Sequence, residues 1–216
     1  MREVLTDIER WRAAGQRVAL ATVVATRRSA PRPIGSKLAV SENGELAGSV
    51  SGGCVENEVY GVAREVLDGG EPRLLTFGIT DDMAFSVGLP CGGEIDVWVA
   101  EPAAEVLEPL VEIVRSEGRA VVFTDLEDGS TRVAGPGEDP VGDELLRSGH
   151  SAVVELAGRP VFADVYAPRR GCSCSARSTP PRRCVPRRSR SAGARSSPMR
   201  ARDLQRRTGS RARTRS

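Results

Sequence analysis

Apolar and polar residues follow regular periods over the N-terminal part of the chain, and these periods switch between those of a helix and a strand. Apolar residues three or four positions apart predict a helix near residues 4–15. Residues 18–26 then form an almost continuous apolar run, which is typical of a strand buried on both faces. The chain therefore opens with a helix that is followed by a buried strand.

A hairpin and a second helix are expected next. Residues 38–40 and 46–50 flank Asn43-Gly44, a dipeptide that favours a hairpin turn. An apolar-periodic run after Cys54 predicts a helix. The further elements are expected as strands 73–77 and 95–100, a helix at 106–114, strands 120–124 and 130–134, a short helix at 143–147, and strands 152–156 and 160–166. This order predicts an α/β fold class with a mixed sheet.

The pattern stops at residue 169. Residues 169–216 hold 16 of the 31 basic residues but only one of the 29 acidic residues, and they are rich in arginine, serine and proline. A segment without apolar periodicity and with many helix breakers cannot bury enough surface to fold. We therefore predict an α/β domain over residues 1–168 and a disordered basic tail over residues 169–216.

Hydropathy and the N-terminal sequence bear on location. No apolar stretch approaches the ~20 residues of a membrane span, and Met1-Arg2-Glu3 opens an amphipathic helix rather than a signal peptide. We expect a cytoplasmic protein without a membrane partner, with Cys54 and Cys91 reduced.

Two cysteines framed by glycine are the clearest candidates for chemistry. They lie in Ser51-Gly52-Gly53-Cys54-Val55-Glu56 and in Gly88-Leu89-Pro90-Cys91-Gly92-Gly93. Glycine permits positive φ, so such loops can leave backbone N–H groups free to point at an anion. Cys54 also precedes a predicted helix, whose N-terminus favours anions and thiolates. The alternative for either cysteine is a small buried apolar side chain beside a tight turn.

A third loop, residues 29–37, carries Arg32 between two prolines. Proline fixes φ and restricts the residue before it, so Arg32 is presented from a stiff loop where its guanidinium suits a phosphate or carboxylate. Lys37, the only lysine in the chain, closes this loop. The alternative is a rigid surface turn with solvated charges.

These three loops, in this order, resemble the XdhC/CoxI family of accessory proteins for molybdenum hydroxylases such as xanthine dehydrogenase and carbon monoxide dehydrogenase. The residues that carry the resemblance are Ser-Ala-Pro-Arg-Pro-Ile-Gly (29–35), Gly-Ser-Val-Ser-Gly-Gly-Cys-Val-Glu (48–56) and Gly-Leu-Pro-Cys-Gly-Gly (88–93). The resemblance implies a non-catalytic chaperone that binds the molybdenum cofactor, molybdopterin, as cargo. It would deliver the cofactor, in sulfurated form, to an apo molybdenum hydroxylase, with a cysteine desulfurase as a candidate further partner.

Molybdopterin has a phosphate and an oxygen-rich metal held by sulfur, so a guanidinium, anion-receiving N–H groups and a soft ligand suit it. Under the resemblance, the cofactor-binding residues are Arg32, Ser51, Gly52, Gly53, Cys54, Glu56, Cys91, Gly92 and Gly93. Cys54 is the first choice for the contacting thiol and Cys91 the second. Glu56 is a candidate hydrogen-bond partner, the alternative being an ordinary first-turn acid that complements the helix dipole. No catalytic residue and no protein metal site is expected.

Other readings stay open. A cysteine-dependent enzyme would use Cys54 as nucleophile, but the only histidine, His150, follows Gly149 at an expected helix end and belongs to no catalytic motif. The basic tail would suit a binder of nucleic acid or of acidic membranes. Asp81-Asp82 is either a metal pair or a solvated pair of acids. A homo-oligomer is a candidate assembly.

The tail itself suggests a shifted reading frame, because 30 of the 31 basic residues of the chain are arginine. When the last base of each codon is read with the first two of the next, residues 171–176 become an apolar strand. The shifted frame then permits a small-residue turn, a helix and a second strand that ends in an acid, the outline of a dinucleotide-binding unit. We hypothesise that one base was lost near codons 168–171, which would replace a C-terminal Rossmann domain. Nucleotide binding is expected only for that missing domain.

Overall fold

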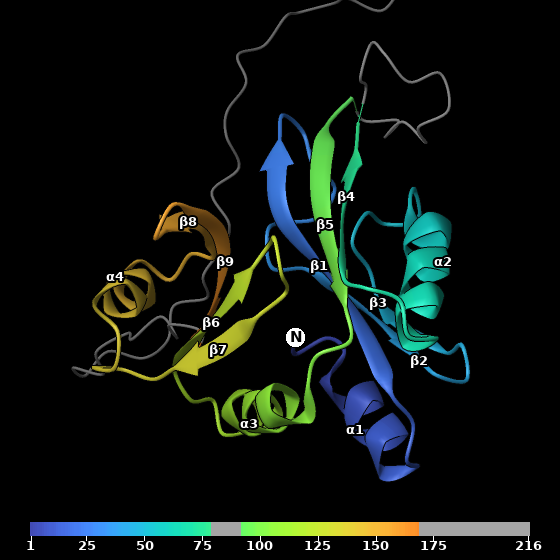
Figure 1. Cartoon of the computed structure of the whole chain (residues 1–216), viewed down its shortest axis with the longest axis horizontal. Helices are drawn as coiled ribbons and strands as arrows, with labels where there is room; N and C mark the ends of the chain where they lie inside the picture. Colours follow the sequence, from blue (N-terminus) through green and yellow to red (C-terminus); the bar gives the residue numbers. More distant parts are fainter. Residues whose placement is uncertain (79–91, 169–216) are drawn as a thin grey trace, which may run out of the picture. The chain divides into compact units, whose positions relative to one another are not determined.

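The computed structural model describes residues 1–78 and 92–168, which contain four helices and nine strands (Figure 1). In chain order these are α1 (Leu5–Ala13), β1 (Val18–Arg27), β2 (Lys37–Ser41), β3 (Leu46–Gly48), α2 (Glu56–Leu67), β4 (Arg73–Phe77), β5 (Glu94–Ala100), α3 (Ala104–Arg115), β6 (Ala120–Asp125), β7 (Thr131–Ala134), α4 (Pro140–Ser148), β8 (Ala152–Leu156) and β9 (Arg159–Tyr166). Each element expected from periodicity is confirmed within a few residues. The expectations for Asp81-Asp82, for Cys91 and for residues 169–216 lie outside the described residues.

The strands form two sheets. The first sheet has the order β3-β2-β1-β5-β4, and the second sheet has the order β7-β6-β9-β8. The α/β class is confirmed, but the pairings in the described residues are all antiparallel, so the expected mixed sheet is wrong in this detail. The reason lies in α2, which links β3 to β4 at opposite edges of the first sheet instead of returning the chain to a parallel neighbour.

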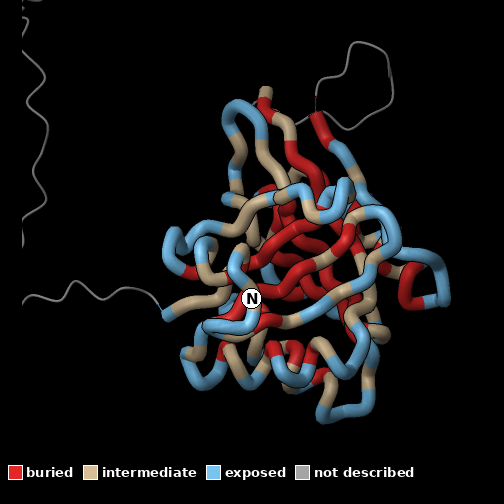
Figure 2. Tube along the Cα trace, turned by 60° about the vertical axis from the view of Figure 1, so that its left-hand side comes forward, coloured by how far each residue is buried: buried red, intermediate tan, exposed pale blue. Residues whose placement is uncertain are grey.

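β1 is buried on both faces, which explains its continuous apolar sequence (Figure 2). On one face Ala19, Ala21 and Val23 pack against α2 in the largest core cluster. On the other face Val18 and Leu20 pack with α1 and α3. The strand thus supplies side chains to two separate hydrophobic cores.

The two sheets face each other, and helices cover their outer faces. α2 packs on the first sheet, and α4 packs on β6 and β9 of the second sheet (Figure 1). Between the sheets, Val24 and Trp98 of the first sheet contact Phe162 of the second. This contact holds the loop after β1 close to the end of β9, where the polar residues described below meet.

A polar cluster is buried where the sheets meet. The Lys37 Nζ lies 2.8 Å from Asp164 Oδ2 and donates a hydrogen bond of 2.9 Å to Thr22 Oγ1. The Ser151 hydroxyl donates to Asp164 Oδ1 across 3.0 Å, and the Tyr166 hydroxyl donates to Oδ2. We name these five residues the inter-sheet cluster. Lys37 is therefore not the solvated surface charge of the alternative reading, because its side chain is only 6% exposed.

Ionisation in the inter-sheet cluster follows from this geometry. Burial works to raise the pKa of Asp164, but the charge and hydrogen bond of Lys37 and the hydroxyl of Tyr166 outweigh it and lower that pKa. Burial, together with the Asp164 charge, raises the pKa of Tyr166 well above its ordinary value. The cluster therefore holds one positive and one negative charge and a neutral phenol.

Candidate functional site

The loop before α2 folds around one carboxylate, that of Glu56. Its Oε1 accepts hydrogen bonds from Ser49 Oγ at 2.6 Å and from the Ser51 N–H at 2.9 Å. Its Oε2 accepts from the Gly53 N–H at 2.8 Å and from the Ser51 hydroxyl. Residues 49–56 therefore form a closed structure, which we name the Glu56 loop.

The two serine hydroxyls complete this structure. Ser51 Oγ accepts hydrogen bonds from the N–H groups of Cys54 at 2.9 Å and Val55 at 3.0 Å. Ser49 Oγ accepts from the Gly52 N–H at 2.8 Å, and the Val50 N–H donates to Glu56. The expectation that these N–H groups are free for an external anion is therefore wrong for this structure. The physical reason is that Glu56 places its own carboxylate where an external anion would bind.

The glycines of the loop are needed for backbone conformation. Gly52 has φ +77° and Gly53 has φ +111°, and a Cβ at either position would meet no atom within 4 Å. Positive φ is disfavoured for residues with a Cβ, so the turn selects glycine even though the space is open. The open space also means that the outer side of this turn is accessible.

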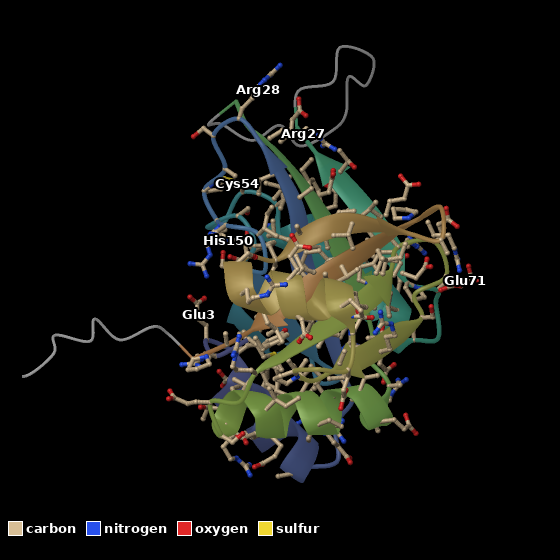
Figure 3. All side chains as sticks on the ribbon, turned by 90° about the vertical axis from the view of Figure 1, so that its left-hand side faces the viewer. Glu3, Arg27, Arg28, Cys54, Glu71 and His150 are labelled. Atoms are coloured by element: carbon tan, nitrogen blue, oxygen red, sulfur yellow. The ribbon has the colours of Figure 1, made fainter. Side chains whose placement is uncertain are left out.

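Cys54 lies two residues before the first residue of α2, as expected. Its side chain is half-buried and packs against the core cluster beneath α2. Its N–H donates to Ser51 Oγ, which in turn donates to Glu56, so these two residues fix the backbone that carries the thiol. The alternative of a fully buried apolar side chain does not hold, since part of the residue reaches the surface (Figure 3).

The charge of Glu56 is set by the same hydrogen bonds. Partial burial acts to raise its pKa, but the hydroxyls of Ser49 and Ser51 and the Ser51 N–H outweigh burial and lower the pKa to about 2. Glu56 is therefore ionised at all physiological pH values. This makes it a permanent anion inside the loop, and its expected role toward a cofactor stays a prediction.

Arg32 lies in the loop between β1 and β2, as expected. Its guanidinium donates to Glu3, while its Nε is buried and has no hydrogen-bond partner among the described residues. The same loop contacts the second glycine motif, because a Cβ on Gly93 would lie 1.8 Å from the Ser29 carbonyl oxygen. Position 93 therefore requires glycine because a side chain would clash with Ser29. Position 92 favours glycine for another reason, since Gly92 has φ +69°. Cys91 lies outside the described residues.

The structure divides the predicted site into two places. Arg32 lines a cavity of about 690 Å³, and the lining of this cavity within the described residues includes no part of the Glu56 loop. His150 lines the same cavity, after Gly149 ends α4 in the left-handed conformation with φ +73°, as expected. Arg32 therefore shares a site with His150 and with the inter-sheet cluster.

Sequence reasoning missed the inter-sheet cluster and the role of Ser49. The signal for Asp164 was a single acid inside the otherwise apolar strand of residues 160–166. No sequence signal paired Asp164 with Lys37, because the two residues meet only when the sheets pack. Ser49 stands seven residues before Glu56, to which it donates a hydrogen bond. The two serines at positions 49 and 51 were the available sequence signal that hydroxyl groups meet in this loop.

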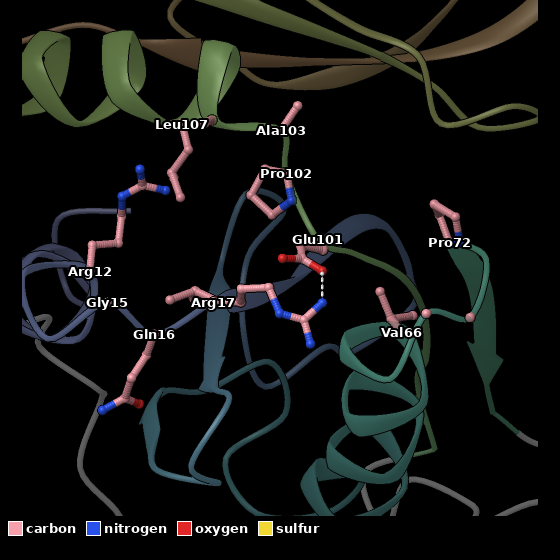
Figure 4. A pocket seen from close by; sticks show the side chains of 14 residues that line it. Arg12, Gly15, Gln16, Arg17, Val66, Pro72, Glu101, Pro102, Ala103 and Leu107 are labelled. Carbon is pink, nitrogen blue, oxygen red and sulfur yellow. Dashed lines mark hydrogen bonds and ion pairs between the residues drawn. The ribbon is translucent and has the colours of Figure 1, made fainter.

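Another cavity, of about 600 Å³, lies near α1 and the end of β5 (Figure 4). Arg17 bonds to Glu101 there across 3.3 Å, and Arg12 bonds to Glu108 across 2.9 Å. These cations already have carboxylate partners. None of the residues predicted for cofactor binding lines this cavity.

Residues 1–78 and 92–168 hold no group of three or more His, Cys, Asp or Glu side chains arranged to bind a metal ion. In the same ranges, no helix combines the length and the apolar character needed to cross a bilayer.

The Glu56 loop lies in a stretch of the chain that is similar to known proteins. The model of the XdhC and CoxI family matches residues 11–78. The molybdenum cofactor insertion chaperone PaoD of Escherichia coli is 36% identical over 102 residues, which cover 45% of this chain and 32% of PaoD. The uncharacterised protein YqeB of Escherichia coli is 32% identical over 82 residues, which cover 38% of this chain and 15% of YqeB.

A solved structure shares the fold. A crystal structure described as a xanthine dehydrogenase from Bacillus halodurans superposes with a TM-score of 0.55 at 21% identity, over 76% of this chain and 52% of that one. The match to this chain spans about a third of PaoD and about half of the crystallised protein. The part of the chain that matches the XdhC and CoxI family is thus its N-terminal region, residues 11–78.

Proposed function

We propose that this chain binds the molybdenum cofactor through the Glu56 loop and delivers it to an apo molybdenum hydroxylase. The carrying observation is that the Glu56 loop, with Cys54 on its surface, lies within the region that matches the family. PaoD, the similar chaperone, inserts the same kind of cofactor by its name. A carrier needs to hold its cargo and release it, and it needs no catalytic residue of its own.

The chemistry of the loop suits this role. A thiolate is a soft ligand of the kind that molybdenum–sulfur centres accept, and Cys54 is half-buried rather than enclosed. The hydrogen bonds from Cys54 and Val55 to Ser51, and from Ser51 to Glu56, hold the loop in one conformation. A fixed loop loses little conformational freedom when it binds, which favours affinity.

The finer parts of the proposal concern cargo and partners. The cargo would be sulfurated molybdopterin, the client a xanthine or carbon monoxide dehydrogenase, and the sulfur donor a cysteine desulfurase. Cys91, Gly92 and Gly93 would contact the cofactor as a second loop. The tail at residues 169–216 and the Rossmann domain lost through a frameshift also remain proposals, as does a cytoplasmic location.

The test is retention of cofactor by cysteine variants of the full chain. Molybdenum cofactor released from a molybdenum enzyme is mixed with the protein, and the retained pterin is measured by fluorescence after gel filtration. We expect Cys54→Ala to retain at least about tenfold less cofactor, because a metal–thiolate contact is lost. Cys184→Ala is the matched control, since it removes a thiol outside the matched region.

Circular dichroism and thermal melting would show whether Cys54→Ala keeps the fold. A folded Cys54→Ala protein that retains cofactor as well as the wild type would overturn the assignment of Cys54. Cys91→Ala would then show whether the second glycine motif carries the thiol contact instead.

A further inference from the structure

The cavity beside Arg32 has the size and lining of a small-molecule site. Its volume is about 690 Å³, within the ~300–1,000 Å³ that is usual for ligand pockets. Polar side chains reach it from the N-terminal segment, the β1–β2 loop, the start of β2, the turn after α4 and β9; among them are Glu3, Arg32, Lys37, His150, Asp164 and Tyr166. This convergence of segments far apart in sequence is independent of the Glu56 loop.

Four residues of the inter-sheet cluster, Lys37, Ser151, Asp164 and Tyr166, form one wall of this cavity. Lys37, Asp164 and Tyr166 line both this cavity and a smaller one of about 300 Å³ between the sheets, so they separate the two. Lys37 and Asp164 neutralise each other across 2.8 Å. A Cβ on Gly35 would lie 3.3 Å from Asp164 Oδ1, so the Arg32 loop rests directly on this wall. The wall therefore positions Arg32, but its own charges cancel and do not attract a charged ligand.

Arg32 brings a buried hydrogen-bond donor to this cavity. Its Nε is buried without a partner among the described residues, although buried donors in folded proteins are nearly always bonded. Its carboxylate partner, Glu3, is 63% exposed, whereas the Arg32 side chain is 29% exposed. An ion pair with so exposed a partner contributes little stability, so a ligand can displace Glu3.

We infer that this cavity binds a small molecule through an oxyanion group, a phosphate or a carboxylate, held by the Arg32 guanidinium. A planar guanidinium binds either group through two parallel hydrogen bonds. The ligand oxygen would satisfy the buried Nε, and Glu3 would move out to solvent. Glu3 is then a competitor for the site, which occupies Arg32 when no ligand is bound.

Because Glu3 competes with the ligand for Arg32, substitutions of these two residues should change the ligand affinity in opposite directions. The full chain is titrated by calorimetry with inorganic pyrophosphate and, separately, with succinate, to distinguish a phosphate ligand from a carboxylate ligand. We expect saturable binding of at least one probe. Arg32→Gln should weaken it by about tenfold or more, and Glu3→Gln should strengthen it severalfold, since one removes the ligand's partner and the other its competitor.

Arg28→Gln is the matched control. It removes the same charge from the same loop, but Arg28 does not line the cavity, and its nearest carboxylate, on Glu94, lies 3.9 Å away. Figure 3 shows Arg28 well apart from Glu3 and His150, which do line it. Binding in this variant should equal that of the wild type. The inference is overturned if neither probe saturates, if Arg28→Gln weakens binding as much as Arg32→Gln, or if Glu3→Gln leaves binding unchanged. Cys54→Ala should not affect these titrations, so this test fails or succeeds separately from the proposed function.

Discussion

The Glu56 loop and the inter-sheet cluster are both built around one carboxylate, but they recruit their partners in different ways. All the partners of Glu56 named above lie within seven residues of it along the chain. Asp164 instead takes a cation from the other sheet, at Lys37, and a hydroxyl from Ser151 before β8. A local sequence motif is sufficient to build the first arrangement, whereas the second needs two sheets to pack.

Burial makes the two arrangements different in energy as well. Glu56 is half-buried, so solvent still contributes to the stabilisation of its charge. Asp164 and Lys37 are 9% and 6% exposed, so each depends on the other for its charge. A buried ion pair adds little net stability compared with apolar residues, but removing one partner leaves a buried charge unpaired. We therefore expect substitutions in the inter-sheet cluster to lower the free energy of unfolding more than substitutions in the Glu56 loop do.

The largest effect is expected for Lys37→Met. Removal of the ammonium leaves the Asp164 carboxylate buried without its cation, which should lower the free energy of unfolding by about 3–5 kcal/mol. Urea unfolding followed by circular dichroism measures this change. The double variant Lys37→Met, Asp164→Leu should recover much of the loss, because no buried charge then remains. If the free energy of unfolding of Lys37→Met were within about 1 kcal/mol of the wild-type value, the buried Asp164 carboxylate would not need Lys37 as its cation.

A smaller effect is expected for Glu56→Gln. The amide keeps the shape but replaces one acceptor oxygen with a donor that faces N–H and O–H groups, which should cost about 2 kcal/mol at neutral pH. Glu58→Gln, on the same helix and exposed, is the matched control and should be close to neutral. Equal unfolding curves for the two variants would contradict the central role of Glu56 in the loop.

The pH dependence of the same pair sharpens this prediction. The folded-state pKa of Glu56 is lowered from 4.5 to about 2, so its contribution is fully present above pH 4.5 and is lost as the pH falls toward 2. The difference in unfolding free energy between wild type and Glu56→Gln should therefore shrink over this range. A difference that stays constant across it would contradict the lowered pKa.

The smallest effect is expected for Gly53→Ala. Because Gly53 has φ +111° in open space, alanine should cost about 1 kcal/mol through backbone strain alone. Gly61 lies within α2 without positive φ and also in open space, so Gly61→Ala should stabilise by about 0.5–1 kcal/mol. Thermal melting of the two variants gives opposite shifts if the conformation of the loop is as described. Shifts of the same sign would contradict it.

Much of the local structure could be predicted from the sequence. The hairpin at Asn43-Gly44 forms between β2 and β3, and Gly44 has φ +85°. Gly149 ends α4 in the left-handed conformation, as its position just after the expected helix at residues 143–147 indicates. Cys54 stands at the start of α2 because apolar periodicity fixes where that helix begins. These features depend on residues close together in the chain, so the local sequence contains the information.

The arrangement of the site could not be predicted in the same way. The sequence placed Arg32 and Cys54 in one candidate site, whereas Arg32 lines a cavity with β9 and Cys54 packs beneath α2. The sequence predicted that the loop N–H groups can donate hydrogen bonds, but it did not predict that the Glu56 carboxylate accepts them. Which acceptor wins depends on where a side chain points in three dimensions, and spacing along the chain does not specify that.

By itself, then, the sequence determined the order and bounds of the helices and strands and the loops that carry the resemblance to a family. Periodicity and glycine positions record these features directly, because they arise from interactions over a few residues. Only the tertiary structure decided that β1 pairs with β5, that two antiparallel sheets pack face to face, and that Lys37 meets Asp164. These contacts join residues far apart in the chain, and they form because packing of the apolar faces brings their polar neighbours together.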